Sequence, residues 1–416
     1  MKRAHELAIE AGLDPLAREP GKPPNWVLFL QQAKEPQRTK YSGVVPTIFG
    51  EHDEGTINQL NDCLKVGNTV SAVLCADGHL GYSQPVGAVI AYEDQISISG
   101  VGWDIGCGNM AVCLDTRYSD LKAKPATLLS DIRKQVSFGV GRINETPVEH
   151  DLFDDVDAWK NSGMEDYRLK AQAQLGTVGS GNHYVDLFYD KEDYVWIGVH
   201  FGSRGLGHTT AARHLKAAGG RDGINAPPTV VDVTSNIGAS YLTGMELCGR
   251  YAYAGREWVV NTVRKIIGGS VTHTVHNHHN YAWKENHGGR DLWVVRKGAT
   301  PAWPGQQGFI GGSMGEDAVI VEGLEAPQTL QSTIHGAGRA YGRKAAKRTF
   351  TKEQMQEWLM QSNVTLSGGD VDESPMAYKR LSDVLTHHAD TIKVTHTLRP
   401  FAVAMAGDDD FDPWKD

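Results

Sequence analysis

The order of hydrophobic and polar positions along the chain predicts a mixture of strands and helices. Short apolar runs bounded by turn residues indicate buried strands at residues 70–75, 88–92, 96–99, 194–200, 292–296 and 318–321. Apolar residues near helical spacing over residues 246–267, followed by Gly268 and Gly269, indicate a long helix that ends at the glycines. Further helices are expected within residues 1–40, where Pro15 interrupts the pattern, across the polar residues 115–174, and over residues 375–388.

These elements follow one another irregularly, which favours an α+β fold. Neither an internal repeat nor a linker divides the chain. Residues 1–407 are therefore expected to form a single domain, with residues 1–40 as a helix-containing N-terminal extension. Residues 408–416 are rich in aspartate and are expected to form a solvated acidic tail.

The composition narrows the class of protein. Glycine occupies 47 of 416 positions and gathers in short clusters, which favours tight turns or loops whose backbone lies close to a ligand. No run approaches the ~20 apolar residues of a membrane span, and the first residues lack the apolar core of a secretory signal. The five cysteines are scattered, which argues against a disulfide framework. We expect a reduced, cytoplasmic protein that does not contact a membrane.

The formal charge of −9 argues mildly against a nucleic-acid partner. Residues 339–348, however, read RAYGRKAAKR. Arg339, Arg343 and Lys347 are spaced by four, so on a helix they would share one face and could hold phosphate groups. The alternative is an ordinary solvated helix face.

A metal centre is the first candidate site. Asp104 and Cys107 lie three residues apart among glycines, so a carboxylate and a thiolate can point at one position. His183, His200 and His279 each lie at a glycine-rich turn or at the end of a predicted strand. Together the five side chains suffice for two metal ions sharing the sulfur, although each residue taken alone is better explained by a structural role. The donor types suit zinc, and the carboxylate also suits manganese.

His335 is the candidate nucleophile. Small residues follow it, and an unprotonated imidazole can attack phosphorus. Gly311, Gly312 and Ser313 begin a loop whose N–H groups can hold an anion, with simple turn formation as the alternative. The sequence has no P-loop, no Rossmann glycine motif and no lysine in a KxDG context, so a transferred nucleotide would have to be carried by histidine.

Seven motifs occur in the order seen in RtcB-type RNA-splicing ligases, and the chain resembles that family over residues 70–400. They are DGHLG at 77–81, GWDIGCG at 102–108, GNH at 181–183, GSRG at 202–205, HNY at 279–281, GSMG at 312–315 and HGAGR at 335–339. The resemblance implies a single RtcB-type domain with mixed sheets around a central cleft for two Mn²⁺ ions. Asp104 and His183 would bind one ion, His200 and His279 the other, and Cys107 both.

The resemblance also implies an activity. His335 would attack GTP and become guanylylated, and the GMP would pass to an RNA 3′-phosphate before a 5′-hydroxyl end displaces it. A 2′,3′-cyclic phosphate end would first be opened, and an archease-like activator is a possible partner. The implied nucleotide contacts are Asn182, His183, Asp186, His279, Asn280, Gly311, Gly312, Ser313, Met314, His335, Gly336, Ala337 and Gly338. The implied RNA phosphate contacts are Arg204, Arg339 and Arg343.

The chain departs from the family pattern at several positions. Asp186 replaces a glutamate, and Ala406 stands where the family has a lysine that contacts guanine. The remaining departures are Phe201, Gly311 and Ala318. Three alternatives therefore stay open. The protein could be an RNA end-processing phosphodiesterase that has kept the metal ligands but lost ligation, a non-catalytic RNA-binding subunit, or a ligase with altered nucleotide preference.

Overall fold

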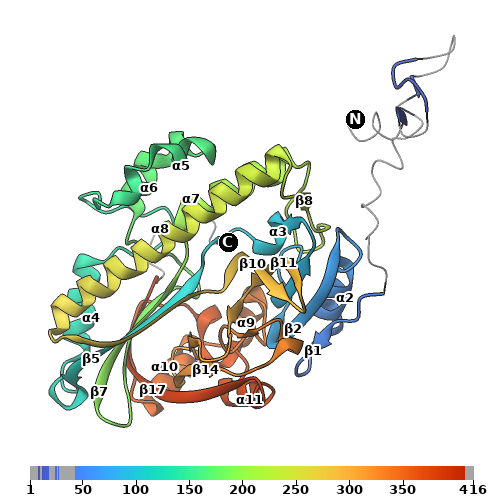
Figure 1. The fold of residues 1–416 in the computed structure, drawn as a ribbon. Helices are drawn as coiled ribbons and strands as arrows, with labels where there is room; N and C mark the ends of the chain where they lie inside the picture. Colours follow the sequence, from blue (N-terminus) through green and yellow to red (C-terminus); the bar gives the residue numbers. More distant parts are fainter. Residues whose placement is uncertain (1–7, 10–11, 18–23, 26, 28–42, 408–416) are drawn as a thin grey trace.

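The computed structural model describes residues 8–9, 12–17, 24–25, 27 and 43–407. It has the expected α+β architecture, in which two sheets lie side by side and helices cover their outer faces (Figure 1). Most of the N-terminal extension and the whole predicted acidic tail lie outside the described residues, although Ala8 and Ile9 are helical. No helix within residues 43–407 or the shorter described segments is long and apolar enough to cross a membrane.

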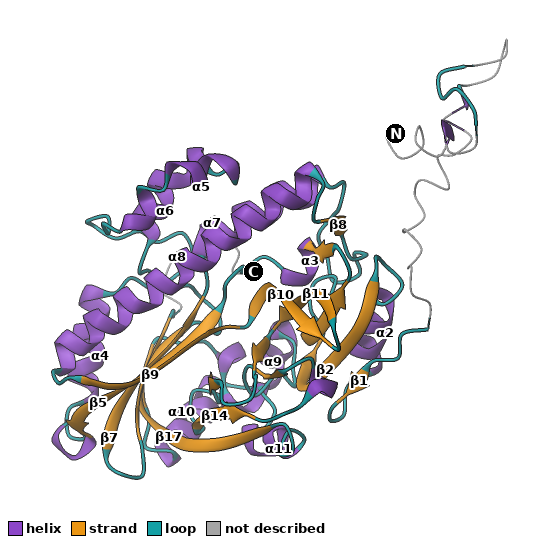
Figure 2. Cartoon of the chain, viewed as in Figure 1, coloured by secondary structure: helices purple, strands orange, loops and turns teal. Residues whose placement is uncertain are grey.

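The larger sheet has eight strands (Figure 2). Buried apolar side chains pack on both of its faces. Its main path, in order, is β13 (Gln307–Ile310), β14 (Ala318–Gly323), β17 (Ile392–Met405), β6 (Tyr184–Tyr189), β7 (Tyr194–Phe201), β5 (Gly108–Arg117) and β9 (Val271–His278), with β16 (Thr365–Ser367) on β17. Side chains alternate across a strand, so Val195 and Ile197 of β7 pack under the long helix, whereas Trp196 faces the opposite core.

The smaller sheet lies beside the first and contributes the other side of the fold. Its five strands, in order, are β1 (Thr47–Ile48), β2 (Thr69–His79), β3 (Val86–Tyr92), β11 (Arg290–Lys297) and β10 (Asn280–His287). Two short pairs complete the strands: β12 (Ala299–Pro301) with β15 (Ser332–Ile334), and β4 (Gln95–Ser97) with β8 (Val230–Asp232).

Helix α8 (Asn236–Ile267) is the longest helix in the described part of the chain and lies across the large sheet (Figure 1). Ser235 caps its first turn, and Gly268, at a φ of 87°, ends it. The other α-helices are α2 (Glu54–Cys63), α3 (Ile98–Val101), α4 (Pro125–Gln135), α5 (Val156–Asn161), α6 (Arg168–Gln174), α7 (Arg204–Ala217), α9 (Arg343–Thr349), α10 (Lys352–Gln361) and α11 (Leu381–Thr386).

Most predicted strands are confirmed, and four expectations about the type or the bounds of an element need correction. Residues 98–99 begin α3 instead of continuing a strand, and residues 115–117 end strand β5 instead of starting a helix. Helix α8 begins ten residues before the predicted start because its N-terminal half is glycine-rich and lacked a strong apolar pattern. Residues 375–388 form a 3₁₀ turn (Pro375–Ala377) and the short helix α11.

Candidate metal centre and active-site cleft

The five expected metal ligands meet at one end of the large sheet. Cys107 directly precedes β5, His183 precedes β6, His200 is the penultimate residue of β7, and His279 follows β9. These neighbouring strands are antiparallel, so the starts of β5 and β6 lie beside the ends of β7 and β9. Asp104 comes from the glycine-rich loop before β5. Strand pairing therefore explains why side chains far apart in the sequence converge.

Two groups of donor atoms share the Cys107 sulfur. In the first group, Asp104 Oδ2 lies 3.0 Å from His183 Nε2, which lies 3.6 Å from Cys107 Sγ. In the second, His200 Nε2 lies 3.3 Å from Cys107 Sγ and 3.3 Å from His279 Nε2. Within each group, all donor atoms lie within 4.8 Å of one another. The arrangement has the spacing of two adjacent metal sites.

The chemical state of these donors fits divalent metal ions. Burial lowers the pKa of His200 and His279, so both imidazoles are neutral. Burial would raise the pKa of Asp104, but the hydrogen bond and charge of His183 outweigh it and lower that pKa. Burial and the Asp104 carboxylate raise the pKa of the Cys107 thiol, and a nearby cation would favour its thiolate. The buried His279 Nδ1 has no hydrogen-bond partner in the described residues.

Groups outside the cluster fix the orientation of the ligands. His200 Nδ1 lies 2.9 Å from the Asn182 carbonyl oxygen, so its Nε2 faces the cluster. Arg204 donates from Nη1 to His183 Nδ1 at 3.2 Å. Arg256, which is fully buried in α8, donates to the carbonyl oxygens of Gly106 and Phe201 at 2.9 and 2.6 Å. These two carbonyls adjoin Cys107 and His200, so a single guanidinium ties together two ligand-bearing segments. Arg256 was not among the residues predicted from the sequence.

His335 lies beside the metal cluster, as the sequence analysis required. Its ring centroid is 4.8 Å from that of His279, in an edge-to-face arrangement. Asp77, at the end of β2, accepts hydrogen bonds from His335 Nδ1 at 2.7 Å and from the His335 backbone N–H at 3.0 Å. Nδ1 therefore carries the proton and donates it in a hydrogen bond to Asp77, so Nε2 keeps its lone pair. The imidazole is less accessible than expected, because its side chain is 12% exposed.

Sequence reasoning did not assign a role to Asp77. Its side chain is completely buried, where a carboxyl group needs a partner. Burial would raise the pKa of Asp77, but the charge and hydrogen bonds of His335 outweigh this effect and lower the pKa. The signal in the sequence was an aspartate directly after an apolar run, within the DGHLG motif.

A cleft of about 1250 Å³ opens above these groups. Of the predicted site residues, all but Arg204 line it, including the whole Gly311–Met314 and His335–Gly338 segments. Arg204 lies behind His183 instead. Asp186 lines the cleft from β6; burial raises its pKa, and its Oδ1 has no hydrogen-bond partner among the described residues. Ala406 also lines the cleft and adds no polar group.

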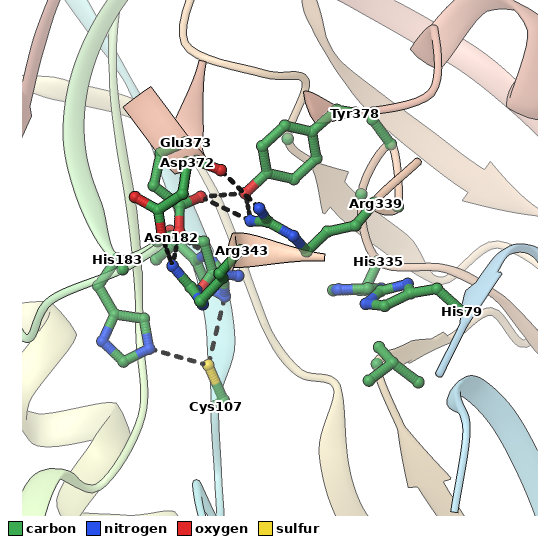
Figure 3. Close-up of a pocket in the computed structure, with 18 of the residues that line it drawn as sticks. His79, Cys107, Asn182, His183, His335, Arg339, Arg343, Asp372, Glu373 and Tyr378 are labelled. Atoms are coloured by element: carbon green, nitrogen blue, oxygen red, sulfur yellow. Dashed lines mark hydrogen bonds and ion pairs between the residues drawn. The ribbon is translucent and has the colours of Figure 1, made fainter. Parts of the chain in front are cut away.

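The predicted basic helix face is wrong, but the cations still gather on one wall. Helix α9 begins only at Arg343, and Arg339 instead forms an isolated β-bridge with Tyr378. Two acidic residues that the sequence analysis did not place in the site, Asp372 and Glu373, meet both arginines (Figure 3). Arg339 Nη1 is 3.2 Å from Glu373, and Arg343 Nη1 is 2.8 Å from Asp372. The arginines are thus held in place by carboxylates.

Comparison with known proteins agrees with this geometry. The family model described as tRNA-splicing ligase RtcB matches residues 59–163 and 153–406. The chain belongs to the RtcB family. Every motif that suggested the resemblance falls within the matched residues, which confirms that prediction.

Similar RtcB proteins occur in bacteria and archaea. RNA-splicing ligase RtcB of Escherichia coli K12 is 30% identical over 367 residues, covering 78% of this chain and 87% of the relative. The tRNA-splicing ligase RtcB of Thermococcus kodakarensis is 28% identical over 419 residues, covering 80% and 87%. That of Archaeoglobus fulgidus is 29% identical over 427 residues, covering 81% and 88%.

Proposed function

We propose that this RtcB protein is an RNA ligase that joins a 3′-phosphate or 2′,3′-cyclic phosphate end to a 5′-hydroxyl end through guanylylated His335. The proposal rests on one juxtaposition: an imidazole oriented by a buried carboxylate lies 4.8 Å, ring to ring, from a residue of a five-ligand cluster. The proposed setting is tRNA splicing or RNA repair in the cytoplasm, with an archease-like protein as a possible activator.

In the first step, His335 acts as the nucleophile. Nδ1–H donates a hydrogen bond to Asp77, so the Nε2 lone pair is free to attack the α-phosphorus of GTP, the Nε2–P bond forms, and pyrophosphate leaves. The imidazole gains positive charge as this bond forms, and the Asp77 carboxylate stabilises it. Two Mn²⁺ ions held by Asp104, Cys107 and the three histidine ligands would neutralise phosphate charge during the transfer.

Two further displacements complete the proposed reaction. An oxygen of the RNA 3′-phosphate attacks the guanylyl phosphorus, the N–P bond breaks, and His335 is regenerated. The 5′-hydroxyl of the second RNA end then attacks the activated 3′-phosphate and GMP leaves, so each bond formed replaces one broken. Arg339 and Arg343 are proposed phosphate contacts, because both line the cleft and are held there by Glu373.

The nucleotide preference is a separate part of the proposal. Asp186, whose Oδ1 has no hydrogen-bond partner within the described part of the chain, is the proposed contact to the base, with Asn182, Asn280 and the Gly311–Met314 loop around the nucleotide. Ala406 supplies no cation where the family has a lysine. We therefore propose that selectivity for guanine is weaker here than in a ligase that has the lysine.

Covalent labelling tests the proposal. The full chain is incubated with Mn²⁺ and each of four α-³²P-labelled nucleoside triphosphates, and the denatured protein is assayed for an acid-labile, hydroxylamine-resistant adduct. We expect labelling with GTP, none in His335→Asn, and normal labelling in His387→Asn, a matched exposed histidine outside the cleft. Absence of an adduct with all four nucleotides would refute the ligase mechanism. RNA end-processing that survives in His335→Asn would instead favour the phosphodiesterase.

A further inference from the structure

An exposed apolar patch lies on the rim of the cleft. It consists of Leu80, Tyr82, Trp103 and Ile224, all of which line the cleft. Leu80, Tyr82 and Ile224 are 45%, 52% and 51% exposed, which is unusual for large apolar side chains gathered in one place. We call these four residues the rim patch. None of them has a role in the chemistry proposed above.

Hydrogen bonds hold the three loops of the rim patch together. The Gln59 side-chain amide donates to the carbonyl oxygens of Gly81 and Ile224 at 2.6 and 2.8 Å. Trp103 Nε1 donates to Asp222 Oδ1 at 3.0 Å, and the Trp103 ring stacks on His208 of α7 at 4.9 Å between centroids. The backbone of these loops and the Trp103 ring are therefore held in place before a ligand binds, which limits the conformational entropy lost on binding.

The Tyr82 ring is the most available surface of the patch. Within the described part of the chain, no aromatic ring packs against it, in contrast to Trp103. Flat aromatic rings at a cleft mouth are the side chains on which unpaired nucleobases stack. Trp103 directly precedes the metal-ligand candidate Asp104, and both residues line the same cleft.

Charge complementarity favours a nucleic acid as the occupant. The cleft is also lined by Arg343, Lys344 and Lys347 of α9. Arg343 is held by Asp372 and Glu373 and Lys347 by Asp370, and this row of positioned cations can contact a phosphate backbone while the apolar side receives bases. We propose that the rim patch is a stacking site for an unpaired base next to a reacting RNA end, with Tyr82 as the main contact. This inference rests on the proposed function, because it requires an RNA end in the cleft.

Paired RNA ligands with and without a base test the inference. The full Mn²⁺-loaded chain is titrated with a single-stranded 3′-phosphate RNA carrying 2-aminopurine at its terminal nucleotide, and with the same RNA carrying an abasic terminal nucleotide. A second pair with a 5′-hydroxyl end shows which strand places its base on the patch. We expect Tyr82→Ala to weaken binding of the 2-aminopurine RNA about 5- to 100-fold and to reduce fluorescence quenching. Tyr82→Phe should bind within about 2-fold of the native chain, because the ring is kept.

The abasic RNA separates stacking from a general structural effect. The native chain and Tyr82→Ala should bind abasic RNA equally, because no base is present to stack. Ile224→Ala should show a smaller loss in the same direction, and Leu169→Ala, which removes an 80% exposed side chain outside the cleft, should show none. Equal losses with both RNAs, or no loss with either, would overturn the inference. Base-dependent binding without any histidine adduct would instead refute the proposed ligase mechanism and leave the stacking site standing.

Discussion

The role of Asp77 gives the sharpest prediction about the reaction. Replacing Asp77 with asparagine keeps the size of the side chain and an oxygen that can accept from His335 Nδ1. It removes the negative charge that faces the imidazole, which in the proposed mechanism becomes cationic as the Nε2–P bond forms. Asp77→Asn should therefore slow nucleotide transfer to His335 much more than it weakens nucleotide binding.

The structure bounds the size of this effect. Asp77 Oδ2 accepts two hydrogen bonds from His335, at 2.7 and 3.0 Å. Only the Nδ1 bond strengthens as the imidazole becomes cationic, and a hydrogen bond to a charged group exceeds a neutral one by about 1 kcal/mol, which sets a loss of about 1 kcal/mol. The Coulomb attraction of two charges ~4 Å apart at an effective dielectric of ~20 sets an upper limit of about 4 kcal/mol. We expect adduct formation to slow about 5-fold and at most about 1000-fold.

Single-turnover labelling with saturating GTP measures this rate. The control for the loss of one negative charge is Asp62→Asn, because the Asp62 side chain lies on α2 and is 64% exposed. Thermal unfolding of both variants checks that the fold is retained. An Asp77→Asn rate within twofold of the native rate would refute the reasoning, because the carboxylate would then contribute nothing to the developing charge.

Three other predictions concern stability and metal binding. Chelation of bound metal should lower the melting temperature, because a metal present at 100-fold its Kd contributes about 2.7 kcal/mol to the free energy of unfolding. Calorimetry should show this loss in the native chain and in the control Cys113→Ala, but not in Cys107→Ala. Burial would raise the pKa of Glu373, but its arginine partners outweigh burial and lower that pKa. The Glu373 charge therefore stabilises the fold above pH ~4.5, and this stability is lost as the pH falls below that value. Glu373→Gln should therefore cost about 1–3 kcal/mol at pH 7 in urea unfolding, and the difference should narrow below pH ~4.5; a constant difference would contradict the assignment. Arg256→Lys should weaken Co²⁺ binding, followed by absorption, about 10- to 100-fold, because a single ammonium cannot also keep the contacts that the Arg256 Nε and Nη2 atoms make with His276 and His278; unchanged affinity would remove its positioning role.

The pattern of apolar residues along the sequence predicted secondary structure reliably where an element is completely buried. The apolar run at residues 194–200 predicted β7, and the double glycine after residue 267 predicted the end of α8. The same reasoning failed at residues 115–117, where polar side chains at the exposed end of β5 resembled a helix start. A strand that continues past the core loses its apolar alternation, so its end cannot be located from the pattern alone.

The sequence by itself determined the chemical inventory of the site. It named five candidate metal ligands and the candidate nucleophile His335, because their residue types and glycine-rich settings are visible without coordinates. It could not supply their partners. Asp77, Arg256 and Glu373 act on residues more than thirty positions away, through contacts that exist only after the strands have paired. Tertiary structure decided these roles because a buried charge takes its partner from whichever residues the fold brings near, and no local spacing encodes that choice.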